Sequence, residues 1–590
     1  MNLKTPHYFL IAAAVVLFTH FGFYPKWQQS DTEATISWDV SGYYLYLPAF
    51  FIYQDVEELA FMEGILETYH PTADLQQAFV HEPSGNRVMK YSAGQAIVFT
   101  PFFLLAHLWA SGSGNYPADG FSFPYQFMIS MGSLIVALLG IWMLLRVLRI
   151  WFTLRIAGLT VLAIVIGSNY LNYSAIDGAM THNSLFTIYA LLLWVTHRFY
   201  DRPTMMRAIP IGLLVGLAAL IRPTEILAAI IPLLWGLDGI SQAGIRQRLQ
   251  FYYQHRSALL VAIILCGMVG LIQLAYWKFV AGEWIVYSYE DQGFSWLHPH
   301  LLDGFLSYKS GWLTYSPLMV FALMGFVPLY RWQRAIFWPA LLFSGLFIYV
   351  TFAWDIWWYG GSLGQRAMVQ AYPVLSLPLA AFLTWVFQQK RWITNPVLLV
   401  FLLFAAANLW FTRHAHRNGL LKVGQMTKAY YWKSLGRSSL DPEYLKLLDT
   451  DEYFTGDRTD VQTVYPAEPD SDWSARLSGD DQYSEEVVVP LHSFNGWIRA
   501  SASFSIESKE WNYWQMTQWQ IRFLNGETIV KQRMIRVHRL LQSHQTNQQL
   551  FFDVKAPKMP YNRMAVQFWN AESSVPITIS DLKVETFRSN

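Results

Sequence analysis

Long apolar segments recur through roughly the first 410 residues, and this feature constrains the fold more than any other. A helix that crosses a bilayer needs about 20 mostly apolar residues, because the hydrocarbon core offers no water to its backbone groups. About eleven segments meet this requirement, and they begin near Tyr8, Pro124, Ile156, Asn183, Ala208, Glu225, Ser257, Tyr315, Ile336, Ala367 and Ile393. The sequence therefore predicts a polytopic α-helical membrane domain over residues 1–412.

The amino-acid composition also indicates that this domain lies in a bilayer. Of the 590 residues, 53% are hydrophobic and 14% are charged, which is too little charge to keep a water-soluble protein of this size hydrated. The formal net charge of +1 gives no electrostatic reason to expect nucleic acid as a partner. The single cysteine, Cys266, lies in an apolar segment, which excludes an intrachain disulfide and a cysteine-based metal site.

Basic residues fall in every second loop between the expected spans, and such loops face the cytoplasm. The basic clusters are Arg146/Arg149/Arg155, Arg198/Arg202/Arg207, Arg246/Arg248/Arg256, Arg331/Arg334 and Lys390/Arg391. Lys4 places the N-terminus on the same side. We therefore expect a multi-pass inner (cytoplasmic) membrane protein whose C-terminal domain is extracytoplasmic, in the periplasm.

One further apolar segment, residues 91–110, breaks this alternation. Counted as a full span, it would place the cluster Arg146/Arg149/Arg155 outside. We therefore predict a surface or re-entrant helix here, bent at Pro101.

The apolar runs shorten to strand length after Asn408 and alternate with polar residues. Asn525 and Gly526, between two such runs, predict a β-hairpin. We expect a β-sandwich over residues 484–590, preceded by a partly helical connector over residues 413–483. Its aromatic residues either fill the core or stack on sugar rings.

Four polar segments lie on the expected outer side, where ionisable residues next to a membrane are candidate functional groups. Asp39 follows the first span, and its alternative role is a helix cap. Asp177 and His182 interrupt two apolar segments, where they either share a proton or a metal ion, or cap helices.

The other two segments carry arginines. Arg222 suits a phosphate by its fork geometry, with pairing to Glu225 as the alternative. Arg366 follows Gly360 and Gly361, which allow a backbone to approach a ligand closely. The aromatic run before these glycines otherwise belongs to an interfacial belt.

These segments, taken in order, give the chain a family resemblance. DVSGYYLYLPAFF, KYSAGQAIVFTPFFLLAH, MTHNSLF, LIRPT, SGWLTYSPLMVFALMG and YGGSLGQRAMVQAYPVL follow one another. Over residues 8–412 the chain resembles the GT-C superfamily of membrane glycosyltransferases, in particular bacterial members related to protein O-mannosyltransferases and lipid A aminoarabinose transferases. The resemblance implies a polyprenyl-phosphate-linked sugar donor and a glycan, lipid or protein acceptor.

The resemblance also implies roles for individual residues. Asp39 would be the base of an inverting transfer. Where many members have paired acids, this chain has Asp39 and Val40, so Asp177 is the expected second acid and the need for a divalent metal stays open. The donor phosphate would be held by Arg222, Arg366, Lys90 and Lys309. The sugar or acceptor pocket would be lined by Tyr43, Tyr44, Trp357, Trp358 and Gln365.

Two other function classes remain. A transporter or flippase of a lipid-linked or cell-envelope glycan would show internal repeats and charged residues at the middle of several spans. The sequence shows no such repeat, and its ionisable residues cluster at span ends. A non-catalytic glycan-binding protein of envelope assembly would rely on the β-domain instead.

Overall fold

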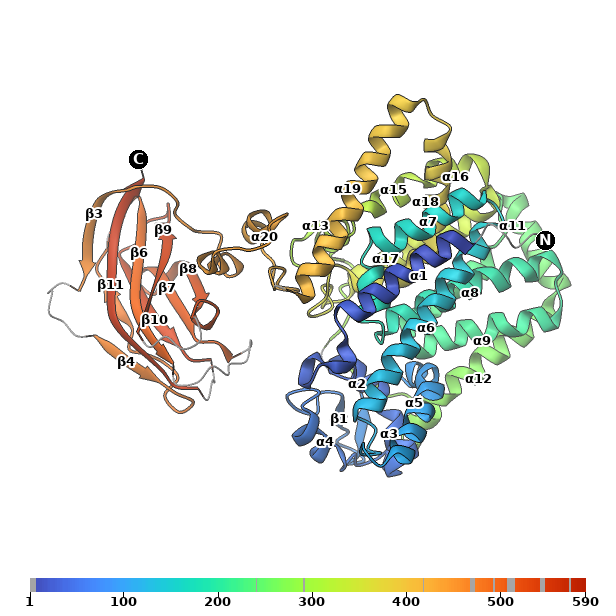
Figure 1. Ribbon diagram of the computed structural model, residues 1–590, viewed down its shortest axis with the longest axis horizontal. Coiled ribbons are helices and arrows are strands. Elements are labelled where there is room, and N and C mark those ends of the chain that lie inside the picture. Colours follow the sequence, from blue (N-terminus) through green and yellow to red (C-terminus); the bar gives the residue numbers. More distant parts are fainter. Residues whose placement is uncertain are drawn as a thin grey trace. The chain divides into compact units, whose positions relative to one another are not determined.

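The computed structural model divides the chain into two compact units, residues 1–424 and 425–590, which are considered separately (Figure 1). The structure describes residues 7–239, 241–289, 292–417, 419–466, 473–491, 494–506, 515–541, 547–571 and 575–589.

The first unit is helical. Its longer helices are α1 (His7–Phe23), α5 (Gly94–Ser113), α6 (Phe123–Leu148), α7 (Leu154–Gly167), α8 (Thr181–Asp201), α9 (Met205–Ile221), α11 (Gln242–Gln254), α12 (Arg256–Val280), α17 (Arg334–Ala353), α18 (Tyr372–Phe387) and α19 (Arg391–His416). Its short helices are η4 (Asn172–Ile176), η5 (Pro223–Ala229), α10 (Ile230–Leu234), α13 (Leu301–Leu306), α14 (Trp312–Tyr315), η6 (Pro317–Met319), α15 (Val320–Met324), α16 (Phe326–Trp332) and η7 (Arg366–Ala371).

Seven helices among the described residues are long and apolar enough to cross a membrane. They make the chain an integral membrane protein. Each expected span falls on a helix or on consecutive short helices, such as η5 with α10 and η6 with α15 and α16. The helix α5 is one of the seven by length and hydropathy, so its expected surface or re-entrant position stays a prediction.

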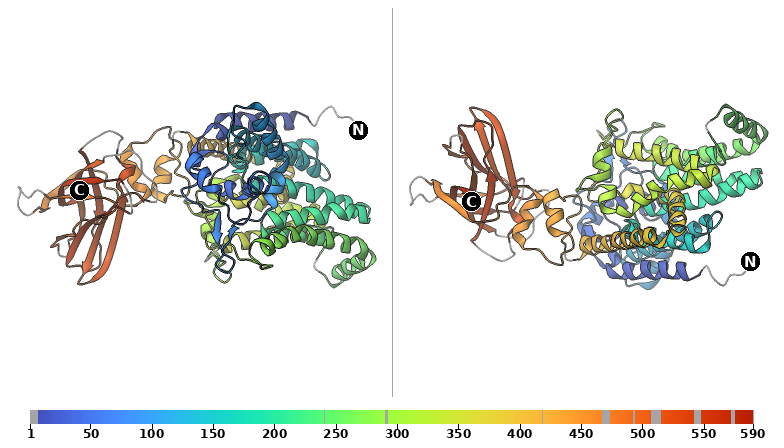
Figure 2. Two further views of the ribbon diagram at one scale, coloured as in Figure 1. Left: turned by 90° about the horizontal axis from the view of Figure 1, so that it is seen from below. Right: turned by 90° about the horizontal axis from the view of Figure 1, so that it is seen from above.

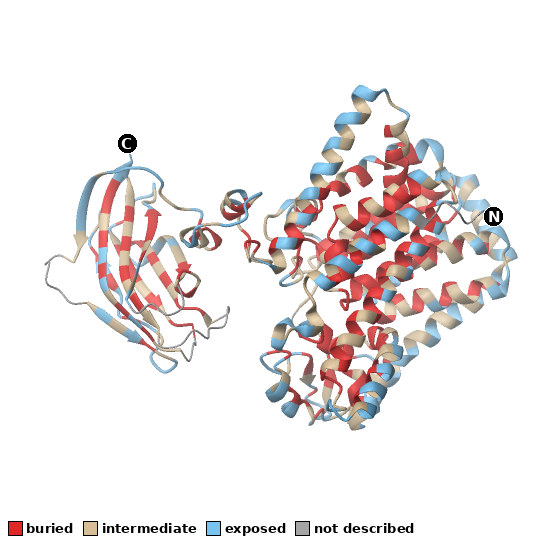
Figure 3. Cartoon of the chain, viewed as in Figure 1, coloured by how far each residue is buried: buried red, intermediate tan, exposed pale blue. Residues whose placement is uncertain are grey.

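Burial separates the inside of this unit from the surface that faces lipid. The helix α18 is almost fully buried, whereas α12 exposes apolar side chains along its length (Figure 3). The helices α12 and α9 approach each other closely at Gly212 and Gly216 of α9. A Cβ atom at either glycine would lie within 3.0 Å of α12. Small residues at such contacts let two helix backbones approach.

The segment between α1 and α5 forms a small layer of its own. It contains η1 (Lys26–Gln28), η2 (Asp31–Glu33), α2 (Trp38–Tyr44), α3 (Tyr46–Pro48), η3 (Ala49–Tyr53), α4 (Met62–Tyr69), and the paired strands β1 (Ala78–Val80) and β2 (Arg87–Met89). This layer lies at one end of the long helices, and α11 with the start of α1 lies at the other (Figures 1 and 2). Which of these ends faces the cytoplasm stays a prediction.

The second unit contains two antiparallel sheets after α20 (Lys428–Ser434) and η8 (Pro442–Leu448). One sheet has the order β5 (Val487–Val489), β10 (Arg563–Trp569), β7 (Gln518–Asn525), β8 (Thr528–Arg536). The other has the order β3 (Arg458–Tyr465), β11 (Ile577–Ser589), β6 (Trp497–Ile506), β9 (Gln548–Lys555), with β4 (Ser474–Leu477) paired to β11. Their inward side chains share one hydrophobic core, as in a β-sandwich.

The predicted hairpin is confirmed, with Asn525 paired to Thr528 and Gly526 at φ +60°. The sheets begin earlier than residue 484, however, because β3 and β4 lie within the expected connector. Most of β3 is exposed, so it lacks the apolar alternation that marks a half-buried strand. Trp519 fills the core and Tyr483 is exposed, where it stacks on Trp569, so the binding of sugar rings by this domain stays a prediction.

Candidate functional site

A cavity of about 490 Å³ opens in the helical unit, where α2, α12, α17, η5 and η7 meet the segment before α5. The expected site residues Asp39, Tyr43, Lys90, Arg222 and Arg366 all line it. Three cations therefore share one chamber with Asp39 and a second carboxylate, described below. Three of the four predicted polar segments, those of Asp39, Arg222 and Arg366, therefore meet at this cavity.

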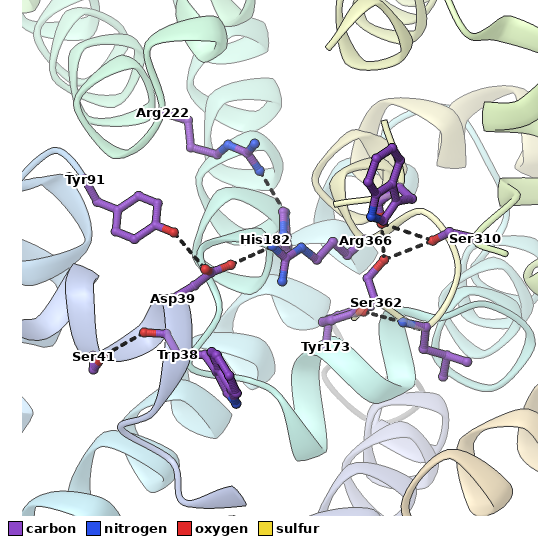
Figure 4. A network of polar contacts seen from close by, with 12 residues as sticks. Trp38, Asp39, Ser41, Tyr91, Tyr173, His182, Arg222, Ser310, Ser362 and Arg366 are labelled. Carbon is purple, nitrogen blue, oxygen red and sulfur yellow. Dashed lines mark hydrogen bonds and ion pairs between the residues drawn. The ribbon is translucent and has the colours of Figure 1, made fainter. Parts of the chain in front are cut away.

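Asp39 lies in the first turn of α2 and is held from two sides (Figure 4). Its Oδ1 accepts a hydrogen bond of 2.7 Å from the Tyr91 hydroxyl, and its Oδ2 accepts one of 2.6 Å from Arg366 Nη2. Burial raises the pKa of Asp39, but Arg366 and Tyr91 outweigh burial, so the pKa lies below its ordinary value. The carboxylate is therefore ionised at neutral pH.

The backbone before Asp39 is strained. Trp38 has φ +47°, a conformation that costs a bulky residue energy. Its amide donates to the carbonyl of Pro71, and its carbonyl accepts from the Ser41 hydroxyl. These bonds hold the turn that directs Asp39 at the cavity.

Arg222 and Lys90 lack the carboxylate partner that Arg366 has in Asp39. The Arg222 guanidinium lies over the Tyr359 ring at 5.4 Å, and its Nη1 is 3.5 Å from His182 Nδ1. Lys90 Nζ is 5.9 Å from the centre of the Tyr289 ring. Neither cation takes part in an ion pair among the residues that the structure describes.

Arg366 itself keeps an unused donor. Its Nε is buried and has no hydrogen-bond partner within the described part of the chain. Buried donors of this kind are rare in folded proteins unless a ligand or water meets them.

The second carboxylate of the cavity is Glu225, at 1% exposure. It accepts hydrogen bonds from the Tyr189 hydroxyl at 2.6 Å and from Gln370 Nε2. Pairing between Arg222 and Glu225 was an alternative from the sequence, but the ion pairs of the described ranges do not include it. Gln370 Oε1 in turn lies 2.9 Å from His182 Nδ1.

Asp177 does not join Asp39. Its Oδ1 is 2.8 Å from Lys26 Nζ, and its Oδ2 accepts from Asn172 at 2.9 Å and lies 4.0 Å from His416. Burial raises its pKa, and Lys26 and His416 lower it, to a net value of about 2. Asp177 therefore ties the end of η4 to η1 and to the end of α19, away from the cavity wall.

The remaining expected residues lie behind the cavity or beside it. His182 is buried between Arg222 and Gln370, so it does not meet Asp177. The described residues include no group of three His, Cys, Asp or Glu that is suited to a metal ion.

The expected pocket residues beyond Tyr43 also contact protein groups. Tyr44 donates to the carbonyl of Gly120, and Gln365 donates to that of Trp357. Lys309 Nζ lies 3.6 Å above the Trp358 ring.

Several cavity residues were not expected from the sequence, and they include Tyr91, Tyr289, Trp354, Tyr359 and Gln370. Tyr91 is the neighbour of Lys90, an expected site residue, so its position in the sequence could have indicated that it lies near the cavity. Tyr289 lies in a long irregular loop, where no periodic pattern indicates which side chain turns inward.

One wall of the cavity is apolar. It is lined by Ile221, Leu227, Trp277, Ile285, Phe347 and Val350. Except for Ile285, which lies in the loop after α12, these side chains come from helices that the sequence places in the membrane, so the cavity offers both ionic and apolar surface.

The sequence matches no family model and no curated protein. Among solved structures, the chain is similar to the arabinosyltransferase EmbB from Mycobacterium smegmatis, with 10% sequence identity and a TM-score of 0.35. The match covers 98% of this chain and 64% of that one, so this chain spans about 64% of the length of the matched chain.

Proposed function

We propose that this protein is a membrane glycosyltransferase that moves a sugar from a polyprenyl-phosphate-linked donor to a hydroxyl of a glycan, lipid or protein on the extracytoplasmic face. The observation that carries the proposal is the cavity in which Asp39, Arg222, Arg366 and Lys90 share one chamber with an apolar wall. A donor with a charged phosphate and a long hydrocarbon chain needs both kinds of surface.

The cations suit the phosphate. Arg222 and Lys90 have no carboxylate partner among the described ion pairs, and Arg366 Nε is an unmet buried donor. Guanidinium groups bind phosphate oxygens in forked geometry, and the low dielectric of a cavity strengthens that attraction. The apolar wall would receive the first isoprene units of the donor.

The transfer follows from these positions. The acceptor oxygen forms a bond to the anomeric carbon as the bond from that carbon to the phosphate oxygen breaks. The electron pair leaves with polyprenyl phosphate, whose growing negative charge Arg222, Arg366 and Lys90 stabilise. Asp39 takes the hydroxyl proton, and attack opposite to the leaving group inverts the anomeric centre.

Arg366 would couple binding to the strength of the base. In the structure its Nη2 neutralises Asp39. A donor phosphate that attracts the same guanidinium weakens this ion pair, so the proton affinity of Asp39 rises when the donor is present. Asp39 then accepts a proton more readily at the moment of attack.

The test uses the full chain in lipid nanodiscs with radiolabelled decaprenyl-phosphoryl sugars and a cell-envelope extract as the acceptor source. Glycosyl transfer releases decaprenyl phosphate and labels the acceptor. The same protein is also reconstituted in sealed vesicles, where movement of the intact donor across the membrane without cleavage would favour the flippase alternative. Binding without either process would favour a glycan-binding protein.

A further inference from the structure

Glu225 is a buried carboxylate whose hydrogen-bond donors among the described residues are all neutral. Tyr189, Gln370 and, at 3.5 Å, Thr224 donate to it, and no cation forms an ion pair with it among the described residues. Taking a carboxylate out of water costs several kcal/mol, and burial next to neutral donors recovers part of this. A group retained at this cost beside a membrane is a functional candidate.

The position of Glu225 relative to the cations is fixed by the backbone. Arg222 ends α9, and Glu225 lies one turn on in η5, where its amide donates to the carbonyl of Arg222 at 2.8 Å. Both side chains line the cavity. A group bound to a phosphate at Arg222 would therefore lie within reach of Glu225.

The hydrogen bonds of Glu225 leave it able to accept more. Oε1 accepts from Gln370 and, at 3.5 Å, from Thr224, whereas Oε2 accepts from Tyr189 alone among the described residues and keeps one of its two lone pairs. Tyr189 comes from α8 and Gln370 from η7, so two separate elements hold the carboxylate in place. Such a preorganised acceptor suits the hydroxyl groups of a sugar.

Resting on the proposed function, we infer that Glu225 is a specificity-determining residue, which binds the hydroxyls of the donor sugar and excludes sugars that carry a carboxylate. Asp39 is unsuited to this role, because Arg366 pairs with its charge and the proposed transfer uses it as the base. A neutral sugar gains hydrogen bonds to the Glu225 carboxyl group, whereas a uronic acid places a second acid group beside it, and two buried acids cannot both ionise without repulsion. The substrate class is thus a donor with a neutral or amino sugar.

The experiment measures equilibrium binding to the full chain in nanodiscs. The probes are decaprenyl phosphates esterified with a neutral hexose, a neutral pentose, an aminosugar or a hexuronic acid. The reference probe is decaprenyl methyl phosphate, a diester of the same charge without a sugar. The protein variants are Glu225→Gln, Tyr189→Phe and Arg222→Ala, with Glu63→Gln on the exposed face of α4 as the matched control.

Wild type is expected to bind at least one uncharged or amino sugar lipid more tightly than the methyl diester, and the hexuronic lipid more weakly. Glu225→Gln should weaken the binding of that sugar lipid by roughly 10-fold or more. It should also reduce the ratio between the affinities for that lipid and for the hexuronic lipid. It should leave the methyl diester unchanged, which also shows that the variant is folded. Tyr189→Phe should give a smaller loss of the same kind, and Glu63→Gln none.

Equal binding of the sugar lipid by wild type and Glu225→Gln would overturn the inference, as would a wild type that binds none of the sugar lipids more tightly than the methyl diester. A different pattern marks failure of the proposed function. If the methyl diester does not bind, or binds equally well to Arg222→Ala, the phosphate site itself is wrong, and the inference is overturned with it.

Discussion

Arg366 Nη2 donates to Asp39 Oδ2 at 2.6 Å, across 327 positions of sequence. The pair joins the first turn of α2, which follows the first span, to η7, which begins a late one. Both side chains are mostly buried, at 18% and 24% exposure, and an ion pair in that environment loses far more than a surface pair when one partner is removed. The cavity is therefore built around a charge pair that requires the whole helical unit to be folded.

Asp39→Asn removes the proposed base and leaves the shape of the side chain. We expect kcat to fall roughly 1,000-fold, because a positioned base contributes on the order of 100 to 10,000 in rate. Donor affinity should hold or improve, because Arg366 loses a competing anion. The measurement is transfer from a labelled decaprenyl-phosphoryl sugar, with Asp303→Asn on the exposed surface of α13 as the control. A variant with unchanged kcat would remove Asp39 from the mechanism.

Tyr91→Phe takes one hydrogen bond from Asp39. That bond favours the ionised form, so its loss raises the pKa of Asp39. A base works only when deprotonated, so the acid-side decline of kcat/KM should move to higher pH, by about one unit. The pH profile checks this, with Tyr116→Phe as a matched change at an exposed tyrosine. A shift toward lower pH, or none, would contradict the role of Tyr91.

Arg222→Ala and Arg222→Lys separate charge from geometry. Lysine keeps the charge but loses the fork, so we expect kcat/KM to fall roughly 10-fold for lysine and 100-fold for alanine. The loss should appear with the whole series of polyprenyl-phosphoryl sugars, because the contact is to the phosphate. If either variant altered the preference among sugars and left the common affinity unchanged, Arg222 would have to lie at the sugar instead.

The spans could be predicted because a bilayer imposes a length and a composition on each helix. Asp39, Arg222 and Arg366 could be grouped because topology placed their segments on one side. The partners of Glu225 could not be predicted, because Tyr189 and Gln370 come from two other helices and neither is unusual in its own segment. Contacts between helices depend on rotation about each axis, which hydropathy does not fix.

The direction in which the Asp177 side chain points could not be predicted from the sequence either. Its segment was expected to face Asp39, but η4 turns the carboxylate toward Lys26 on the chain segment that follows α1. The β-domain boundary was missed for a related reason, because β3 is an exposed, polar edge strand whose pairing to β11 leaves no mark in its sequence.

Asp177→Asn tests whether this residue braces the fold or acts as a second acid. We expect thermal stability to fall by about 2 kcal/mol, because Lys26 loses its partner in a mostly buried site, while transfer changes less than about twofold. The folded pKa of about 2 lies below the ordinary value of 3.8, so the contribution of the carboxylate is fully present above about pH 5 and is lost as the pH falls through 2. The stability difference between wild type and variant should therefore stay constant from pH 5 to 8 in thermal unfolding of the detergent-solubilised protein.

Adding Lys26→Met to Asp177→Asn should reduce stability by less than the sum of the two single changes, because the ion pair is already broken. A large loss of transfer at unchanged stability would return Asp177 to the chemistry as the second acid.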